Sequence, residues 1–180
     1  MNYRLIVRQL GLLVLGLSAV LLCIWIWSAA SLGFNGNGVF AVLWSTGISA
    51  ILGCLLYVCG TSGKSEQGTG SMGRREALLL VSTSWIVGAI VSGLPFLIWG
   101  RTGQNDDHPF HSVINCFFEA MSGLTTTGAT ILTDIATVPA PLLFWRAMTQ
   151  WLGGLGIVVL FIAVLPSLGV GGKKLFKVES

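Results

Sequence analysis

The chain has 180 residues, of which 53% are hydrophobic and only 9% are charged. Soluble domains carry about 25% charged residues, so this composition excludes an ordinary soluble protein and indicates a membrane protein. The formal net charge of +3 does not argue for nucleic acid as a partner, because the basic residues flank apolar stretches, where they set topology.

Four apolar stretches are long enough to cross a bilayer, since a spanning helix needs about 20 mainly apolar residues. These stretches are Leu10–Ala30, Val39–Gly60, Ala77–Trp99 and Pro141–Leu165. The first could instead be a secretory signal, but its apolar run exceeds the usual length of about 7–15 residues. We therefore expect four spanning helices, the first of them uncleaved.

Lysine and arginine gather before the first stretch, between the second and third, and after the fourth. These residues are Arg4, Arg8, Lys64, Arg74, Arg75, Lys173, Lys174 and Lys177. The turn between the first two stretches has no basic residue, and the segment after the third has only Arg101. The positive-inside rule therefore predicts a multi-pass protein with both termini in the cytoplasm.

Between the third and fourth stretches, "HSVINCFFEAMSGL" (His111–Leu124) is an apolar segment about a dozen residues long. As a helix with Ser112 at its N-cap, it would extend roughly 18 Å, about half of the ~30 Å hydrocarbon core. Its length predicts a re-entrant half-helix that stops at mid-membrane, after which the chain returns to the outer side. We also expect the third span to kink or end near Pro95.

The half-helix is followed by Thr125, Thr126, Thr127 and Gly128. Non-helical backbone at membrane depth is tolerated only where protein buries it or where it lines water. Threonine hydroxyls and carbonyl oxygens can replace the hydration shell of an alkali cation, and Gly128 permits the backbone that turns them toward one axis. Alternatively, the threonines form a polar kink in an ordinary helix, with hydroxyls bonded to preceding carbonyls.

Two segments together carry a resemblance to a known family. "FFEAMSGLTTTGAT" followed by "FWRAMTQWLGGLGIVVLFIAVLP" resembles the first pore repeat of the Trk/Ktr/HKT superfamily of potassium transporters, nearest the bacterial Trk potassium uptake membrane subunit. The resemblance covers roughly Ala77–Leu165, and the two leading helices fit the extra N-terminal pair of the Trk branch.

With the charge-set topology, the resemblance implies an all-α integral membrane fold. Two leading transmembrane helices are followed by one helix–re-entrant pore loop–helix repeat. The expected divisions are residues 1–60 for the leading hairpin, 61–76 for a cytoplasmic linker, 77–165 for the repeat and 166–180 for a cytoplasmic tail.

The function that the resemblance implies is potassium uptake across the bacterial inner membrane. K⁺ would be the transported ion, bound by Thr125–Gly128 as the filter segment, and no organic cofactor is expected. Family members surround one filter with four repeats, so a chain with one repeat is expected to be a fragment of a longer transporter. An alternative is a structural or assembly membrane protein without conduction of its own.

The resemblance also implies partners. These are the remaining three repeats, a cytoplasmic nucleotide-binding regulatory subunit, a second copy of the full-length protein and membrane lipid.

Two charged residues near the loop have alternative roles. Glu119 is expected to hydrogen-bond the filter backbone from behind, or else to be solvated near the outer vestibule. Arg146 either snorkels to headgroups or braces the loop through a salt bridge to Glu119 or Asp134. The glycines of "WLGGLG" (Trp151–Gly156) predict close helix packing, with Gly153 away from the loop; a gating hinge is the alternative.

No catalytic or separate metal site is expected. Asp106, Asp107, His108 and His111 lie in one loop, but no third ligand follows at a motif spacing, which predicts a solvated loop that leads into the next helix. A membrane enzyme built on Glu119 and the two histidines is a further alternative. The four cysteines are expected to fill apolar space; they are Cys23, Cys54, Cys59 and Cys116.

Overall fold

The computed structural model describes residues 3–34, 36–61, 74–103 and 108–164. Within these ranges the chain forms α-helices and short 3-10 helices, which confirms the all-α prediction. The elements are α1 (Tyr3–Leu32), α2 (Asn37–Thr61), α3 (Arg74–Thr102), η1 (Pro109–His111), α4 (Val113–Leu124), η2 (Ile135–Thr137) and α5 (Ala140–Val164). Most of the predicted linker, residues 62–73, and the predicted tail lie outside the described residues.

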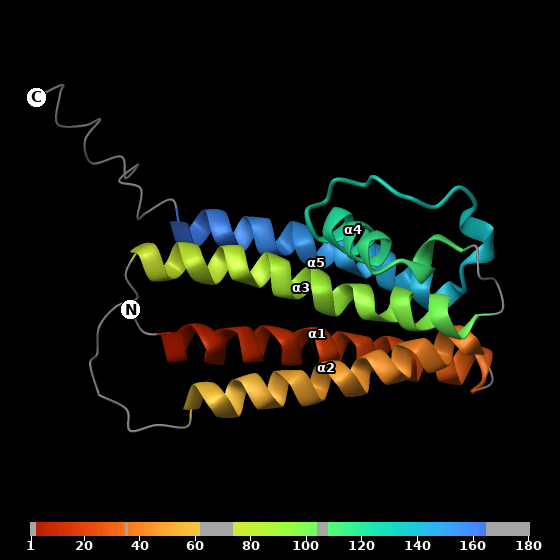
Figure 1. The fold of residues 1–180 in the computed structure, drawn as a ribbon, viewed down its shortest axis with the longest axis horizontal. Coiled ribbons are helices and arrows are strands. Elements are labelled where there is room, and N and C mark those ends of the chain that lie inside the picture. Colours follow the sequence, from red (N-terminus) through yellow and green to blue (C-terminus); the bar gives the residue numbers. More distant parts are fainter. Residues whose placement is uncertain (1–2, 35, 62–73, 104–107, 165–180) are drawn as a thin grey trace, which may run out of the picture.

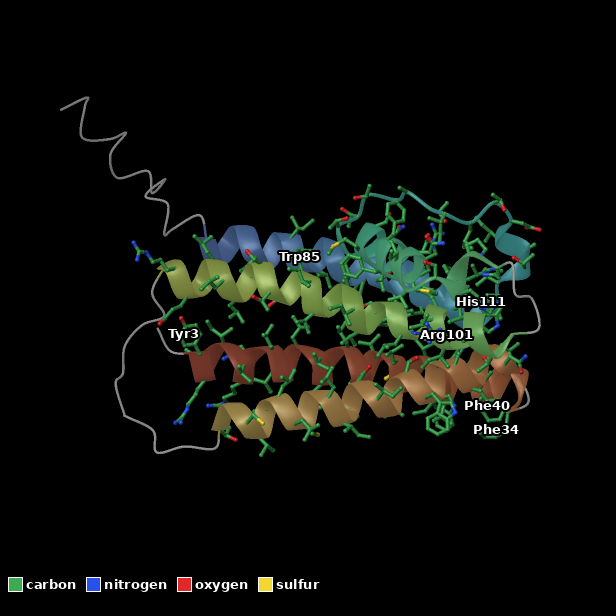
Figure 2. The ribbon with its side chains drawn as sticks, viewed as in Figure 1. Tyr3, Phe34, Phe40, Trp85, Arg101 and His111 are labelled. Atoms are coloured by element: carbon green, nitrogen blue, oxygen red, sulfur yellow. The ribbon has the colours of Figure 1, made fainter. Side chains whose placement is uncertain are left out.

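Four of the described helices, α1, α2, α3 and α5, are long and apolar enough to cross a membrane, as predicted. They lie side by side along the long axis of the molecule (Figure 1). Figure 2 shows Tyr3 at one end of this bundle and Phe34, Arg101 and His111 at the other. The α1–α2 turn and the end of α3 therefore lie at the same end.

The two leading helices pack through glycines. A Cβ on Gly11 would lie 2.6 Å from the backbone nitrogen of Tyr57, and one on Gly53 would lie 3.0 Å from that of Leu15. The backbones of α1 and α2 can approach this closely because neither glycine has a side chain. Farther along the pair, the Ser18 hydroxyl donates to the carbonyl of Thr46 at 3.1 Å.

Of the two effects expected at Pro95, an early end was wrong, because α3 continues to Thr102 with Pro95 inside it, and a kink stays a prediction. The proline cannot donate to the carbonyl one turn earlier. Tertiary contacts flank the break: the Trp145 indole N–H donates to the Ser92 carbonyl at 2.9 Å. On the other side, the ring of Phe96 stacks on Phe110 with centroids 4.9 Å apart. We infer that packing on α5 and η1 keeps the helix continuous.

The leading hairpin attaches to α5 at the end where its turn lies. A Cβ on Gly38 would lie 2.7 Å from Cβ of Pro139, and the rings of Trp27 and Phe144 are 5.2 Å apart. The buried core joins α1 and α2 to the repeat; it comprises Leu21, Ile24, Val42, Phe96, Phe110, Cys116, Ala120, Leu132, Val138, Leu142 and Trp145.

The short helix α4 enters from this same end and stops at mid-length. Near its start, Gly100 at the end of α3 packs against the Phe110 carbonyl. At its own end, Leu124 packs against Gly88 and Gly153, which lie near the middles of α3 and α5. The segment after α4 then runs back to the end of the bundle where α5 begins (Figure 1). The half-length helix and the returning segment match the predicted order of elements.

We predict that Gly11→Ala destabilises the α1–α2 pair, because its methyl group would overlap backbone atoms of Tyr57 that cannot rotate away. Overpacking of this kind costs about 1–3 kcal/mol. Gly16→Ala is the matched control on the same helix, since nothing lies within 4 Å of a Cβ there. Melting temperatures of the purified protein in detergent measure both; an equal effect of the two substitutions would contradict the packing role.

Candidate functional site

The last turn of α4 closes with a hydrogen-bond pattern that ties the loop to the helix. The Thr126 N–H donates to the Gly123 carbonyl at 2.9 Å, and the Thr127 N–H donates to the Ser122 carbonyl at 3.0 Å. This pair of bonds is a Schellman motif, in which the residue after the C-cap takes a left-handed conformation. Here the C-cap is Thr125.

A threonine, Thr126, occupies that left-handed position with φ = 56°. Glycine is the usual residue there, and a β-branched side chain in this region is an outlier that costs of the order of 1–3 kcal/mol. Two residues later Gly128 also has a positive φ, 76°. The backbone therefore changes direction twice within four residues, at the cost of strain in one of them.

The loop presents carbonyl oxygens that accept no hydrogen bond from the described part of the chain. Residues 125–130 are exposed on the surface of the described chain. Within the ranges that the structure describes, no donor bonds the carbonyl oxygens of Thr125, Thr126, Thr127 and Gly128. The hydroxyls of Thr125 and Thr127 lie 2.7 Å apart, and that of Thr125 also reaches the Met121 carbonyl at 2.8 Å. Oxygens of this kind are suitable ligands for an alkali cation.

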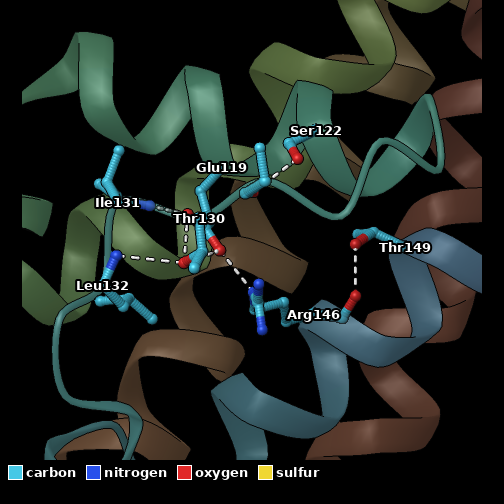
Figure 3. A network of polar contacts seen from close by, with 8 residues as sticks. Glu119, Ser122, Thr130, Ile131, Leu132, Arg146 and Thr149 are labelled. Atoms are coloured by element: carbon cyan, nitrogen blue, oxygen red, sulfur yellow. Dashed lines mark hydrogen bonds and ion pairs between the residues drawn. The ribbon is translucent and has the colours of Figure 1, made fainter.

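The carboxylate of Glu119 was expected from the sequence to bond the backbone of Thr125–Gly128, but it bonds the returning segment two residues later instead (Figure 3). It accepts hydrogen bonds from the Thr130 hydroxyl at 3.0 and 3.1 Å and from the Ile131 N–H at 3.1 Å. The Thr130 hydroxyl in turn accepts from the Leu132 N–H at 3.1 Å. Glu119 is 1% exposed, which excludes the solvated position that was its alternative.

Arg146 on α5 supplies the charge that Glu119 needs. Its Nε donates to the Glu119 carboxylate, so of the alternatives for Arg146 the salt bridge to Glu119 is the one present. A buried carboxylate without a partner would be strongly unfavourable. Asp134, the other partner considered for Arg146, instead accepts from the Ala136 N–H at 2.9 Å and caps η2.

The sequence predicted that Gly153 lies away from the loop, and this was wrong. A Cβ there would fall on the Leu124 carbonyl and lie 2.6 Å from its carbon atom. A Cβ on the next residue, Gly154, would lie 3.9 Å from the methyl carbon of Thr126. The spacing of the glycines indicated close packing, but the partner helix could not be identified without knowing where α4 crosses α5.

The histidines have structural surroundings. His108 Nδ1 accepts from the Phe110 N–H at 3.2 Å and so caps η1. Burial lowers the pKa of His108, as does the neighbouring His111. Among the described residues no three His, Cys, Asp or Glu side chains gather as metal ligands, and Asp106 and Asp107 lie outside those residues.

Two residues of the site were missed by the sequence reading. Ser122 donates to the Ala129 carbonyl at 2.6 Å, which pins the loop to the last turn of α4. Thr130 links Glu119 to the returning backbone. Both hydroxyls stand within the segment quoted above, so a search for polar partners of a re-entrant loop could have found them.

Comparison with known proteins finds similar sequences among potassium uptake proteins. A family model described as cation transport protein, TrkH, matches residues 100–180, which include α4, the loop and α5. The Trk system potassium uptake protein TrkH of Escherichia coli K12 is 35% identical over 179 residues, which cover 99% of this chain and 34% of that protein. TrkH of Vibrio parahaemolyticus is 44% identical over 105 residues, or 58% of this chain and 20% of that protein.

The fold agrees with a solved structure. The crystal structure of the potassium transporter TrkH from Vibrio parahaemolyticus has a TM-score of 0.76 at 34% identity. The match covers 96% of this chain and 34% of that chain, so the present chain spans about a third of the length of these relatives. The chain is therefore similar along nearly its whole length to TrkH potassium uptake proteins, and the TrkH model of cation transport proteins matches its residues 100–180.

Proposed function

We propose that this chain supplies one side of the ion filter of a potassium uptake protein in the bacterial inner membrane. The observation that carries the proposal is the strained loop at the end of a half-length helix, whose four carbonyl oxygens have no donor in the described chain. Its relatives are potassium uptake proteins by name. K⁺ would exchange its hydration shell for the oxygens of Thr125–Gly128 and pass through by diffusion.

One loop provides oxygens on one side of an ion only. A cation that is partly coordinated in a low-dielectric slab retains a large desolvation penalty. We therefore propose that three further repeats complete the filter, which is consistent with relatives about three times as long. A nucleotide-binding regulatory subunit on the cytoplasmic side and a second copy of the complete protein are the other partners that we propose.

The orientation follows from charge. The starts of α1 and α3 carry three basic residues, Arg4, Arg8 and Arg75. They lie at the end of the bundle opposite to the α1–α2 turn and the start of α5 (Figure 1). We propose that this end faces the cytoplasm, because positively charged flanks are retained there. The oxygens of residues 125–128 then lie near mid-membrane, and α4 points its negative C-terminal dipole at the ion.

We predict that substitutions of Gly128 reduce the discrimination of K⁺ over Na⁺, least with Asn, more with Ala and most with Val. No heavy atom lies within 4 Å of a Cβ at this position, so the effect is one of backbone strain at φ = 76°, not of collision. Asn tolerates the left-handed region better than Ala, and β-branched Val tolerates it least. Uptake of K⁺ and Na⁺ by cells that express the complete gene product measures the ratio.

Gly154→Ala is the control for Gly128, since a Cβ there makes only an ordinary contact at 3.9 Å. It should retain the ion ratio at similar protein levels. If Gly128→Val kept the K⁺ preference of the unmodified protein, the loop would not be the filter.

We predict strong coupling between Glu119 and Arg146. Glu119→Gln or Arg146→Gln alone leaves one charge unpaired in a buried network, which costs about 3–5 kcal/mol. The double substitution removes both charges and should cost clearly less than the sum of the two single changes. Thermal unfolding of the four proteins in detergent gives the coupling energy. Additive effects would mean that the ion pair does not support the returning segment.

Residues 1–180 expressed alone should not restore growth of an uptake-deficient bacterium at low K⁺, whereas the complete gene product should. The physical reason is the incomplete coordination that a single loop provides. Equal amounts of both proteins in the membrane are the necessary control. Potassium-selective uptake by the short chain, together with a cross-linked tetramer, would show instead that four copies can assemble one filter.

A further inference from the structure

The end of α4 packs against two glycines, one on α3 and one on α5. The Leu124 side chain lies 3.4 Å from the Cβ position of Gly88 on α3. Its backbone lies against Gly153 on α5, where a Cβ would overlap the carbonyl group. Both glycines are buried. Any side chain larger than hydrogen at position 153 must therefore move the last turn of α4 away from α5.

A second close contact lies one turn earlier on α5. A Cβ on Gly123 would meet the hydroxyl oxygen of Thr149 and lie 3.2 Å from Cβ of the same residue. The Thr149 side chain cannot turn aside freely, because its hydroxyl donates to the Arg146 carbonyl at 2.7 Å (Figure 3). At two successive turns, then, the spacing of α4 and α5 is as small as glycine allows.

The loop cannot move independently of this contact. Its N–H groups at Thr126 and Thr127 are bonded to the carbonyls of Gly123 and Ser122, within the same turn that touches α5. A displacement of that turn would carry Thr125–Gly128 with it. The oxygens would then stand at a different distance from an ion on the pore axis.

We propose that Gly123 and Gly153 are positioning residues that set the place of the loop oxygens through the spacing of α4 and α5. The inference rests on the potassium filter proposed above and extends it from the loop to the helix behind it. Ion preference depends on the number and arrangement of coordinating oxygens. A wider α4–α5 spacing should therefore lower the discrimination of K⁺ from Na⁺ and not merely reduce folding.

The test uses the complete gene product with Gly123→Ala, Thr149→Ala, the double variant Gly123→Ala/Thr149→Ala, and Gly153→Ala. The K⁺-to-Na⁺ uptake ratio is measured at matched amounts in the membrane, beside the melting temperature in detergent. Gly123→Ala should lower the ratio several-fold, and Thr149→Ala should restore it in the double variant by removing the obstructing hydroxyl. Gly153→Ala should lower it as well, and a second double variant, Gly153→Ala/Thr149→Ala, should show no rescue, because the obstruction at Gly153 is the Leu124 backbone.

Gly156→Ala is the control on the same helix, since its Cβ would lie 3.8 Å from the Trp85 ring, an ordinary contact. If Gly123→Ala and Gly153→Ala lower only the melting temperature and leave the ratio intact, the proposal is wrong and the contact is structural. Should Gly153→Ala fail to fold, the uptake ratios of Gly123→Ala and of Gly123→Ala/Thr149→Ala still test the proposal.

The Gly128 variants separate this proposal from the filter itself. If they change the ion ratio and Gly123→Ala does not, only the positioning role fails. If neither changes it, the filter proposal fails as well.

Discussion

The whole site depends on one requirement: backbone that leaves a helix in the middle of a membrane bundle must either find its hydrogen bonds within the protein or line a water-filled cavity. Glu119 contributes to this on the returning segment, where its carboxylate accepts from the Thr130 hydroxyl and the Ile131 N–H. Arg146 neutralises the charge that this arrangement buries. A neutral acceptor would bond fewer donors, and an unpaired carboxylate would be too costly at this depth. The cation that α5 carries opposite α4 therefore stabilises the non-helical conformation of the returning segment through Glu119.

Residues 125–128, by contrast, leave their carbonyl oxygens without hydrogen bonds in the described chain. Thr126 keeps a left-handed backbone that glycine would adopt without strain. A loop that only filled space would lower its energy by bonding these oxygens and by having glycine at position 126. The hydrogen-bonded groups at Thr130 and Ile131 lie only a few residues from the donor-less carbonyls of residues 125–128. Such a combination suits an ion pathway, because the hydrogen bonds hold the loop rigid while its free carbonyl oxygens keep their positions.

Much of this arrangement could be predicted from the sequence. Apolar length predicted the four long helices, and the short length of His111–Leu124 predicted a helix that stops halfway. Glu119 and Arg146 were two charges in an apolar environment, so their pairing was an expected alternative. The end of the third span at Pro95 was predicted wrongly, because the contacts that flank this proline come from Trp145 and Phe110, which lie elsewhere in the chain. The contact of Gly153 with Leu124 depends on where α4 crosses α5, and a positive φ at Thr126 is rare for its residue type.

The most direct test of the account is to locate the ion. Crystals of the complete gene product grown with Rb⁺ or Tl⁺ in place of K⁺ would give anomalous scattering at each bound cation. We predict a peak within coordination distance of the carbonyl oxygens of Thr125–Gly128, reduced in the Gly128→Val protein. A peak elsewhere in the bundle, with none at this loop, would contradict it.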